Sequence, residues 1–329
     1  MTFKIAFLVE GGLEMGMGHV YRSLALAEEL RDKGEICFLT SSGHEIMGKI
    51  SENGFKAINL KSDVDILAHL VELEPKIIII DKLEVQEGFI KKLRELVDAK
   101  LVIFGNLSGA NKYADIVVNA HVGSDFRNRR VVDPDTQTLY FYGPRYFILR
   151  REFHSLKTGK KGRNKFQRIL LIFGGADPSN LTSKVLRKLL LMKEDFKIDV
   201  LVGPLFPYLA DLEDLIKSYP GKNVSVYRDV RNVAAFMVDS DLVITSPGSS
   251  MYEALFIGIP VIAISQSEFQ RTIFTKSFPI LQEKDLVKLE DVIYNEQFIK
   301  PSDEYVVKLD IGRGKKEIVE AILMERRSL

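Results

Sequence analysis

The sequence predicts an α/β protein built from two parallel-sheet domains, and three observations lead to this prediction. At 329 residues the chain is longer than a single hydrophobic core usually supports. Short apolar runs alternate with helix-length amphipathic segments, which is the pattern of βαβ units. The alternation stops at the basic, Gly-containing stretch 154–167 and then starts again. We therefore expect domains over residues 1–153 and 168–329, joined by a linker over 154–167.

In the first half, Ile5–Val9 is expected to form the first strand, followed by a Gly-rich turn. Val20, Leu24, Ala27 and Leu30 then recur at helical spacing, and Gly34 ends that helix. The run of four isoleucines before Asp81 fits a strand buried on both faces. Besides this run, Ile77–Ile80, the other strands expected in this half are Ile36–Leu39, Leu101–Phe104 and Ile116–Val118.

In the second half, helices are expected from about Leu181 and from Met251, and a final amphipathic helix over Lys315–Met324. That last helix could pack back on the first domain. The strands expected here are Ile169–Phe173, Ile198–Val202, Val224–Tyr227, Leu242–Thr245 and Pro260–Ile264.

Bulk composition excludes several classes of protein. The formal net charge is only +1, so no global field favours nucleic acid or an acidic surface as the partner. The one cysteine, Cys37, lies in an apolar run and is expected to be a buried thiol in a reducing compartment. No stretch reaches the roughly 20 apolar residues of a membrane span, and the N-terminus lacks a signal-peptide pattern. We expect a cytoplasmic protein whose oligomeric state is open.

The first motif, GGLEMGMGHVYRS over residues 11–23, lies between a strand and a helix. A dinucleotide fingerprint needs a third glycine where Tyr21 stands, and an acidic residue that is missing after the second strand, so a nicotinamide cofactor is not expected. His19 stands at the helix start, where the helix dipole favours a neutral imidazole that can act as a general base. A histidine that merely bonds the backbone there is the alternative.

Two motifs in the second half suggest anion binding. In FGGADPSNLT, residues 173–182, Asp177 is expected as helix cap with Pro178 at the first helical position, and the free N–H groups of that helix start could hold a diphosphate. A plain β–α turn is the alternative. In SPGSSMYEALFIGIP, Ser249 and Ser250 stand at another helix start, and Glu253 one turn inside could accept bonds from two ribose hydroxyls. The residues around Ser250 do not form the G-x-S-x-G elbow of a serine hydrolase.

The order of GMGHVYRSLALAEEL, GPRYFILRREF, FGGADPSNLT and PGSSMYEALFIGIP resembles the UDP-2,4-diacetamido-2,4,6-trideoxy-altropyranose hydrolases of the pseudaminic acid pathway. These are relatives of the GT-B glycosyltransferases that include the peptidoglycan N-acetylglucosaminyl transferase. The resemblance implies a GT-B fold, with two Rossmann-like domains facing across a cleft, no metal and no cofactor. It also implies inverting attack of water at the anomeric carbon of a UDP-sugar.

The resemblance also implies roles for individual residues. His19 would be catalytic, with Asp81 as a helper, and Gly18 and Arg22 would shape the sugar side. The remaining substrate-binding residues would be Gly175, Gly248, Ser249 and Ser250 at the diphosphate, Glu253 at the ribose, and Asn180 and Gln270. The chain departs from the family on the sugar side, at Lys82-Leu83, Gly105-Asn106 and Phe269.

Two alternatives are open. The first is a glycosyltransferase of the same fold that moves the sugar to a hydroxyl acceptor. The second is a protein that binds a nucleotide-sugar without catalysis. A metal site is not expected, because the histidines are scattered and no H-E-x-x-H pattern is present. No Walker pattern indicates a nucleoside triphosphate site.

Overall fold

The structure is a computed structural model that describes residues 3–120, 127–156, 166–268, 270–271, 278–295 and 309–325. The chain divides into two compact units. Unit 1 comprises Met1–Met15, His19–Ile148 and Leu309–Leu329; unit 2 comprises Gly16–Gly18 and Leu149–Lys308. The segment from Leu309 onward, which the sequence grouped with the second domain, therefore belongs to unit 1.

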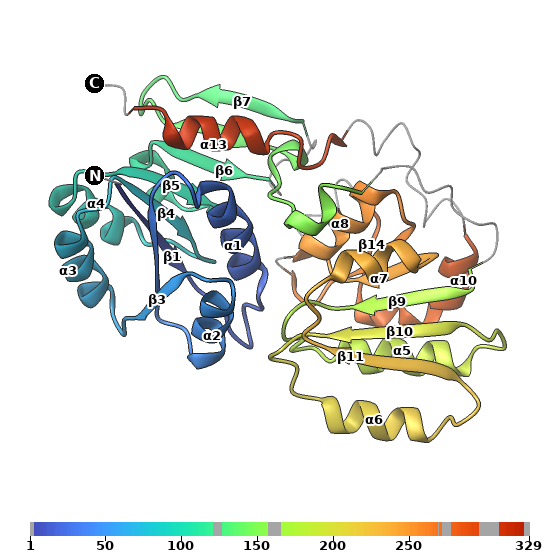
Figure 1. Ribbon diagram of the computed structural model, residues 1–329. Coiled ribbons are helices and arrows are strands. Elements are labelled where there is room, and N and C mark those ends of the chain that lie inside the picture. Colours follow the sequence, from blue (N-terminus) through green and yellow to red (C-terminus); the bar gives the residue numbers. More distant parts are fainter. Residues whose placement is uncertain are drawn as a thin grey trace. The chain divides into compact units, whose positions relative to one another are not determined.

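Unit 1 is built on an eight-stranded sheet (Figure 1), with strand order β3-β2-β1-β4-β5-β6-β8-β7. Neighbouring strands are parallel except for β7, which pairs antiparallel with β8. The strands are β1 (Lys4–Val9), β2 (Glu35–Thr40), β3 (Lys56–Asn59), β4 (Ile77–Asp81), β5 (Lys100–Phe104), β6 (Ile116–Asn119), β7 (Arg129–Val132) and β8 (Leu139–Tyr142). Strands β4 and β5 are buried at every residue, as the isoleucine run predicted for β4.

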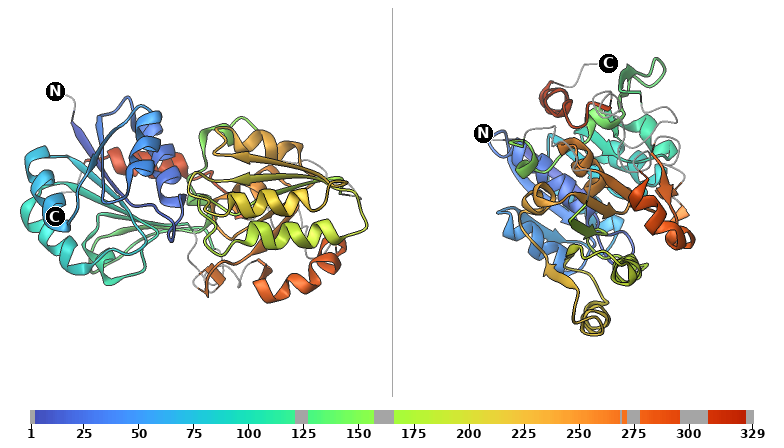
Figure 2. Two further views of the ribbon diagram at one scale, coloured as in Figure 1. Left: turned by 90° about the horizontal axis from the view of Figure 1, so that it is seen from below. Right: turned by 90° about the vertical axis from the view of Figure 1, so that its right-hand side faces the viewer.

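Helices cover both faces of this sheet. One core packs Ala6 and Leu8 of β1 against Ile66 and Leu70 of α3 and against residues of α4. On the opposite face, α1 and α13 lie side by side (Figure 2), and an ion pair of 2.5 Å joins Lys315 to Glu29. The helices of unit 1 are α1 (Gly18–Leu30), α2 (His44–Glu52), α3 (Asp63–Leu73), α4 (Glu87–Leu96) and α13 (Lys315–Leu323), with 3-10 turns η1 (Gly109–Tyr113) and η2 (Pro144–Tyr146). The first residue of α1, Gly18, groups with unit 2.

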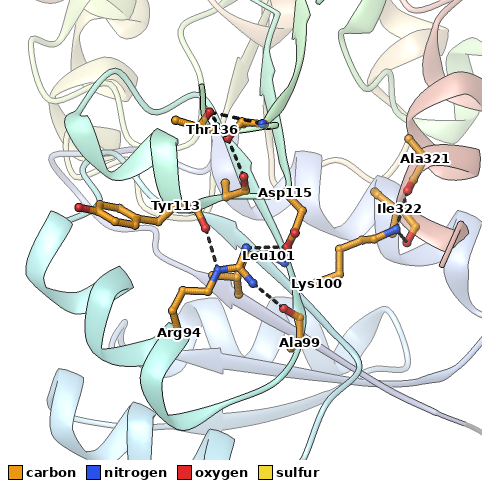
Figure 3. A network of polar contacts seen from close by, with 11 residues as sticks. Arg94, Ala99, Lys100, Leu101, Tyr113, Asp115, Thr136, Ala321 and Ile322 are labelled. Carbon is orange, nitrogen blue, oxygen red and sulfur yellow. Dashed lines mark hydrogen bonds and ion pairs between the residues drawn. The ribbon is translucent and has the colours of Figure 1, made fainter. Parts of the chain in front are cut away.

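The amino edge of the sheet carries two polar clusters that are structural (Figure 3). Arg94 donates to Asp115 at 2.6 Å, and the same carboxylate accepts from the backbone N–H of Leu101. Lys100 donates to the carbonyls of Ala321 and Ile322 at 2.9 and 3.2 Å. A cation at the C-terminal carbonyls of α13 satisfies groups that a helix end leaves unpaired, and it complements the helix dipole.

Unit 2 contains a six-stranded, all-parallel sheet in the order β11-β10-β9-β12-β13-β14. Its main core packs strand residues against α5, α6 and α10, while α7 and α8 contact β9, β12 and β13. The strands are β9 (Arg168–Ile172), β10 (Lys197–Val202), β11 (Asn223–Arg228), β12 (Leu242–Thr245), β13 (Val261–Ile264) and β14 (Ile280–Leu281). The helices are α5 (Leu181–Leu191), α6 (Leu209–Lys217), α7 (Val233–Asp239), α8 (Ser249–Ile257) and α10 (Leu289–Tyr294), with 3-10 turns η3 (Arg151–Phe153) and η4 (Glu283–Lys288).

Both sheets reverse their strand order beside the first strand of the unit. In unit 1 the reversal lies between β1 and β4, and in unit 2 between β9 and β12. Ligands of open α/β sheets bind outside the carboxyl ends of the strands at this switch point. All three sequence motifs follow one of these four strands and so lie beside a switch point, the position where open α/β sheets generally bind ligands. None of the described helices is both long and apolar enough to span a membrane.

Candidate active site

In unit 1 the switch point brings His19 and Asp81 together. His19 is the second residue of α1, which follows β1, and Asp81 is the last residue of β4. Strands β1 and β4 pair with Val9 opposite Asp81. As a result, Nδ1 of His19 lies 2.6 Å from Oδ1 of Asp81. A carboxylate at this distance accepts the Nδ1–H, which leaves Nε2 of the neutral ring as a proton acceptor.

Arg22 has a different place from the one expected. Its guanidinium holds Asp81 with two bonds, Nε to Oδ2 at 2.7 Å and Nη2 to Oδ1 at 2.5 Å. The Arg22 side chain is only 9% exposed, and a Cβ at Gly105 would lie 3.2 Å from its Nη2. Arg22 therefore holds the Asp81 carboxylate in place from within the buried part of the unit. The expectation that it shapes the sugar side directly does not fit this burial.

Asp81 is an anion held in a buried site. Burial alone would raise its pKa, but the charge and hydrogen bonds of Arg22, together with those of His19, lower the pKa to about 2. Ser23 adds a bond from its Oγ at 3.3 Å. A carboxylate that stays ionised at neutral pH does not exchange protons there. It orients the imidazole and stabilises the imidazolium that forms when Nε2 takes up a proton, which is the arrangement of a histidine general base.

In unit 2 the helix start after β12 is open. Gly248 is the N-cap residue of α8 with φ 154° and ψ −151°, and no side chain caps this helix. That backbone region is essentially restricted to glycine. The first turn of α8 contains no acidic residue. Uncapped N–H groups at the positive end of a helix bind anions such as phosphate. Ser249 and Ser250, both half-buried, are the first two residues of the helix.

The helix start after β9 is closed, which corrects the expectation for this motif. Asp177 accepts from the backbone N–H groups of Leu181 and Thr182 at 2.9 and 2.8 Å, and Asn180 is the N-cap residue and accepts from Ser183. Pro178 therefore precedes the cap instead of opening the helix. The amides proposed to hold a diphosphate are bound by the chain itself, beside a carboxylate. Asn180 thus has a capping role that the sequence did not assign to it.

Glu253 is buried and already paired. Its carboxylate is 1% exposed and forms two bonds with Arg150, Nε to Oε1 at 2.7 Å and Nη2 to Oε2 at 2.5 Å. Burial raises the pKa of Glu253, and the charge and hydrogen bonds of Arg150 oppose that shift. Arg150 belongs to the GPRYFILRREF motif, but the sequence gave no reason to connect position 150 with position 253.

The other expected binding residues lie as follows. Gly18 is exposed, and a side chain there would meet nothing within 4 Å. Gly175 makes room for Met17 of the same unit, since a Cβ at this glycine would lie 2.1 Å from Met17 Cγ. Gln270 Oε1 accepts from the backbone N–H of Gln266 at 2.8 Å, which ties the residue to the loop after β13. Phe269 lies outside the described residues, as do 121–126 and most of the expected linker, 157–165.

Lys82, where the chain departs from the resembled family, forms an ion pair of 2.7 Å with Glu10 at the carboxyl edge of the sheet. Asn106, another of these departures, is buried and donates to Ser108 and Asn111. Within the described residues, no three His, Cys, Asp or Glu side chains gather in a way that could hold a metal ion.

Comparison with known proteins identifies relatives along the whole chain. An uncharacterized protein of Methanocaldococcus jannaschii is 45% identical over 326 residues, which are 97% of this chain and 66% of the relative, so the chain spans only part of that protein. The Bacillus subtilis spore coat polysaccharide biosynthesis protein SpsG is 29% identical, over 96% of this chain and 94% of its own. The UDP-2,4-diacetamido-2,4,6-trideoxy-beta-L-altropyranose hydrolase of Campylobacter jejuni is 24% identical, over 77% and 88%. No family model matches the chain.

Solved structures establish the fold class. The crystal structure of MurG from Acinetobacter baumannii is similar with a TM-score of 0.63 at 13% identity, covering 98% of this chain and 99% of that one. The calicheamicin glycosyltransferase CalG4 has a TM-score of 0.60 at 15% identity, with 98% of each chain covered. HepE of Anabaena in complex with UDP-glucose has a TM-score of 0.55 at 13% identity, covering 97% and 99%. The chain therefore has the α/β fold of the GT-B glycosyltransferases, with two parallel-sheet domains, as the sequence predicted.

Proposed function

We propose that this protein is an enzyme that hydrolyses a UDP-sugar, releasing UDP and the free sugar. The observation that carries the proposal is the His19–Asp81 pair at the switch point of unit 1, supported by Arg22. In the proposed reaction, Nε2 of His19 removes a proton from water while the water oxygen attacks the anomeric carbon. The bond from that carbon to the diphosphate oxygen breaks, UDP leaves, and the configuration at the carbon inverts.

The nucleotide part of the substrate is assigned to unit 2. The uncapped start of α8 at Gly248–Ser250 offers backbone N–H groups and hydroxyls to the diphosphate, and the helix dipole stabilises its negative charge as it leaves. Among the relatives, the Campylobacter jejuni enzyme is named as a hydrolase of a UDP-linked diacetamido-trideoxy sugar. That name, together with the UDP-glucose bound to HepE, supports a UDP-sugar as the substrate class. A diacetamido-trideoxyhexose used in surface-sugar biosynthesis is our first candidate.

The test is incubation of the pure protein with single UDP-sugars and no acceptor. UDP release that grows with time, and free sugar in the opposite anomeric configuration, are expected. His19→Asn should lower the rate by about 10²–10⁴, the usual worth of a positioned general base, and leave UDP affinity unchanged. His69→Asn on α3 is a matched control outside the site. The hydrolase proposal is wrong if UDP appears only when an acceptor is added.

One observation favours a transferase as the second candidate. Three strongly exposed leucines follow three adjacent strands of unit 1: Leu13 after β1, Leu83 after β4 and Leu107 after β5. They are far apart in sequence, so no apolar run in the sequence predicted that they would share one edge of the sheet. Exposed apolar side chains at the edge where ligands bind would suit an acceptor with an apolar group. Strict dependence of UDP release on such an acceptor would support transfer. Binding of UDP-sugars without any turnover would support the non-catalytic alternative.

A further inference from the structure

The Arg150–Glu253 pair connects two parts of unit 2 that lie about a hundred residues apart in the chain. Arg150 is the second residue of the segment Leu149–Lys308, which forms most of unit 2. Glu253 is the fifth residue of α8, one turn beyond the uncapped helix start at Gly248. The guanidinium and the carboxylate lie side by side with two parallel bonds of 2.7 and 2.5 Å. Paired bonds of this kind fix the plane of the carboxylate as well as its position.

Arg150 is itself held in place. Its Cζ lies 5.4 Å from the centre of the Phe153 ring, and its Nη1 lies 3.6 Å from Glu152. The guanidinium is 17% exposed, whereas the carboxylate it holds is 1% exposed. A carboxylate this deeply buried would lose its charge if it had no cationic partner. Arg150 therefore determines both the orientation of Glu253 and its capacity to accept hydrogen bonds as an anion.

The pair leaves acceptor capacity on Glu253. An ionised carboxylate has about four lone-pair sites. The two side-chain bonds from Arg150 use one on each oxygen, and the backbone N–H of Arg150 donates a third bond. A hydroxyl of a nucleotide ribose can donate to the remaining site of a carboxylate whose plane is fixed.

We propose that Arg150 is a positioning residue that orients the Glu253 carboxylate to accept a hydrogen bond from a ribose hydroxyl of the nucleotide, and so makes the site selective for ribonucleotides. The inference rests on the proposed function, because it takes a uridine nucleotide as the ligand. Arg150 acts through Glu253 and need not touch the ligand itself.

Unit 2 offers a matched control. Arg168 pairs with Asp199 at 2.5 Å, and Asp199 is also fully buried. Arg168 is the first residue of β9, so this pair lies at the amino edge of the sheet, away from the edge where ligands bind. Loss of either arginine leaves a buried carboxylate unpaired and lowers stability. Only loss of Arg150 should change the choice of nucleotide.

The experiment measures the Kd of UDP and of 2′,3′-dideoxy-UDP by calorimetry for the parent protein, Arg150→Met and Arg168→Met. The parent should prefer UDP about tenfold or more, the worth of hydrogen bonds to a charged group. Arg150→Met should reduce that preference to less than about threefold while its affinity for dideoxy-UDP stays near the parent value. Arg168→Met should keep the parent preference. Arg150→Lys, which retains the charge without the two-pronged geometry, should be intermediate.

If Arg150→Met does not fold, the double variant Arg150→Met/Glu253→Gln replaces the ion pair with neutral side chains, and it should also show no preference. A preference retained in either Arg150 variant overturns the inference. A parent that binds UDP and dideoxy-UDP equally well also overturns it, while the proposed function stands. A parent that binds neither nucleotide overturns both.

Discussion

Nδ1 of His19 lies 2.6 Å from Oδ1 of Asp81, although the two residues are 62 positions apart in the chain. The contact follows from sheet order, because β4 is placed directly beside β1 and both strands end at the same edge. A histidine after the first strand and an acid at the end of the fourth are thereby brought within hydrogen-bond distance. The pair does not depend on any local sequence motif.

The Asp81→Asn variant should lower kcat by about 10²–10⁴, because an amide does not hold the imidazole in the required tautomer as a carboxylate does. UDP affinity, which we assign to unit 2, should stay unchanged. The control is Asp115→Asn, which removes a carboxylate bonded to Arg94 at 2.6 Å at the opposite edge of the same sheet (Figure 3). Steady-state rates and calorimetric UDP binding check this prediction. Equal loss of activity in both variants would assign Asp81 a purely structural role.

The Arg22→Met variant should change the pH dependence of the rate. Arg22 is the main group that lowers the pKa of Asp81 against the effect of burial. Without it burial prevails, Asp81 becomes protonated at a higher pH, and the acid limb of kcat/KM should move upward by about one pH unit or more. Activity near pH 9 should recover toward the parent value. Arg22→Lys should shift the limb less. An unchanged acid limb in Arg22→Met would contradict the role given to Arg22.

The same pKa predicts how stability depends on pH. The folded-state pKa of Asp81 is about 2, below its ordinary value of 3.8. Between these values the unfolded chain binds a proton that the folded chain does not, so stability falls as the pH falls from about 4 to 2. Above pH 4 the contribution is fully present, on the order of 2 kcal/mol. The free energies of unfolding of the parent and of Asp81→Asn, measured in urea, should therefore differ above pH 4 and converge near pH 2.

A surface carboxylate provides the comparison for this measurement. The pKa of Glu87 is also lowered to about 2, mainly by hydrogen bonds from Lys91 and Lys112, but its side chain is 36% exposed. Because salt screens exposed charges, 1 M NaCl should reduce the effect of Glu87→Gln and leave that of Asp81→Asn nearly unchanged. A salt-sensitive Asp81 effect would mean that the carboxylate is not held in a buried site.

The Asn180→Ala variant should lower stability by about 1 kcal/mol, the typical worth of a helix N-cap, and leave UDP affinity unaltered. The reason is that Asn180 and Asp177 already occupy the first amides of α5. Thermal unfolding and UDP calorimetry check both parts. A large loss of UDP affinity with unchanged stability would restore the diphosphate role first expected at this helix start.

The sequence predicted most of the parallel strands, because buried runs such as Ile77–Ile80 admit few other structures, but it missed β3, β8 and β14. It did not predict β7, whose four residues are all exposed and lack the alternation of a half-buried strand. The sequence predicted that helices start after β9 and β12, but not which of the two starts has free N–H groups. The motifs after β9 and β12 both contain glycine, proline and serine, and only the structure distinguishes a start closed by Asp177 from one left open at Gly248.

The site residues show the same limit. His19 was selected for its place at a helix start and Asp81 through the family resemblance; the structure brings the two side chains together, while their catalytic roles stay predictions. The sequence did not predict that Arg22 and Arg150 each hold a buried carboxylate. An arginine on a helix face or in a connecting segment is expected to be a solvated charge until its buried partner is known. Pairings across 59 and 103 positions leave no periodic signal in one sequence.

The bond from Lys100 to the carbonyl of Ala321 spans 221 positions. During synthesis at about 5–20 residues per second, the ribosome would deliver α13 roughly 10–45 s after β5. For that interval the face of the unit 1 sheet beside α1 would be without the helix that covers it, while the intervening residues supply nearly all of unit 2. Synthesis of unit 1 thus begins before that of most of unit 2 but is completed after it. A nascent chain stalled before residue 309 would expose apolar surface of unit 1 that a chaperone could recognise.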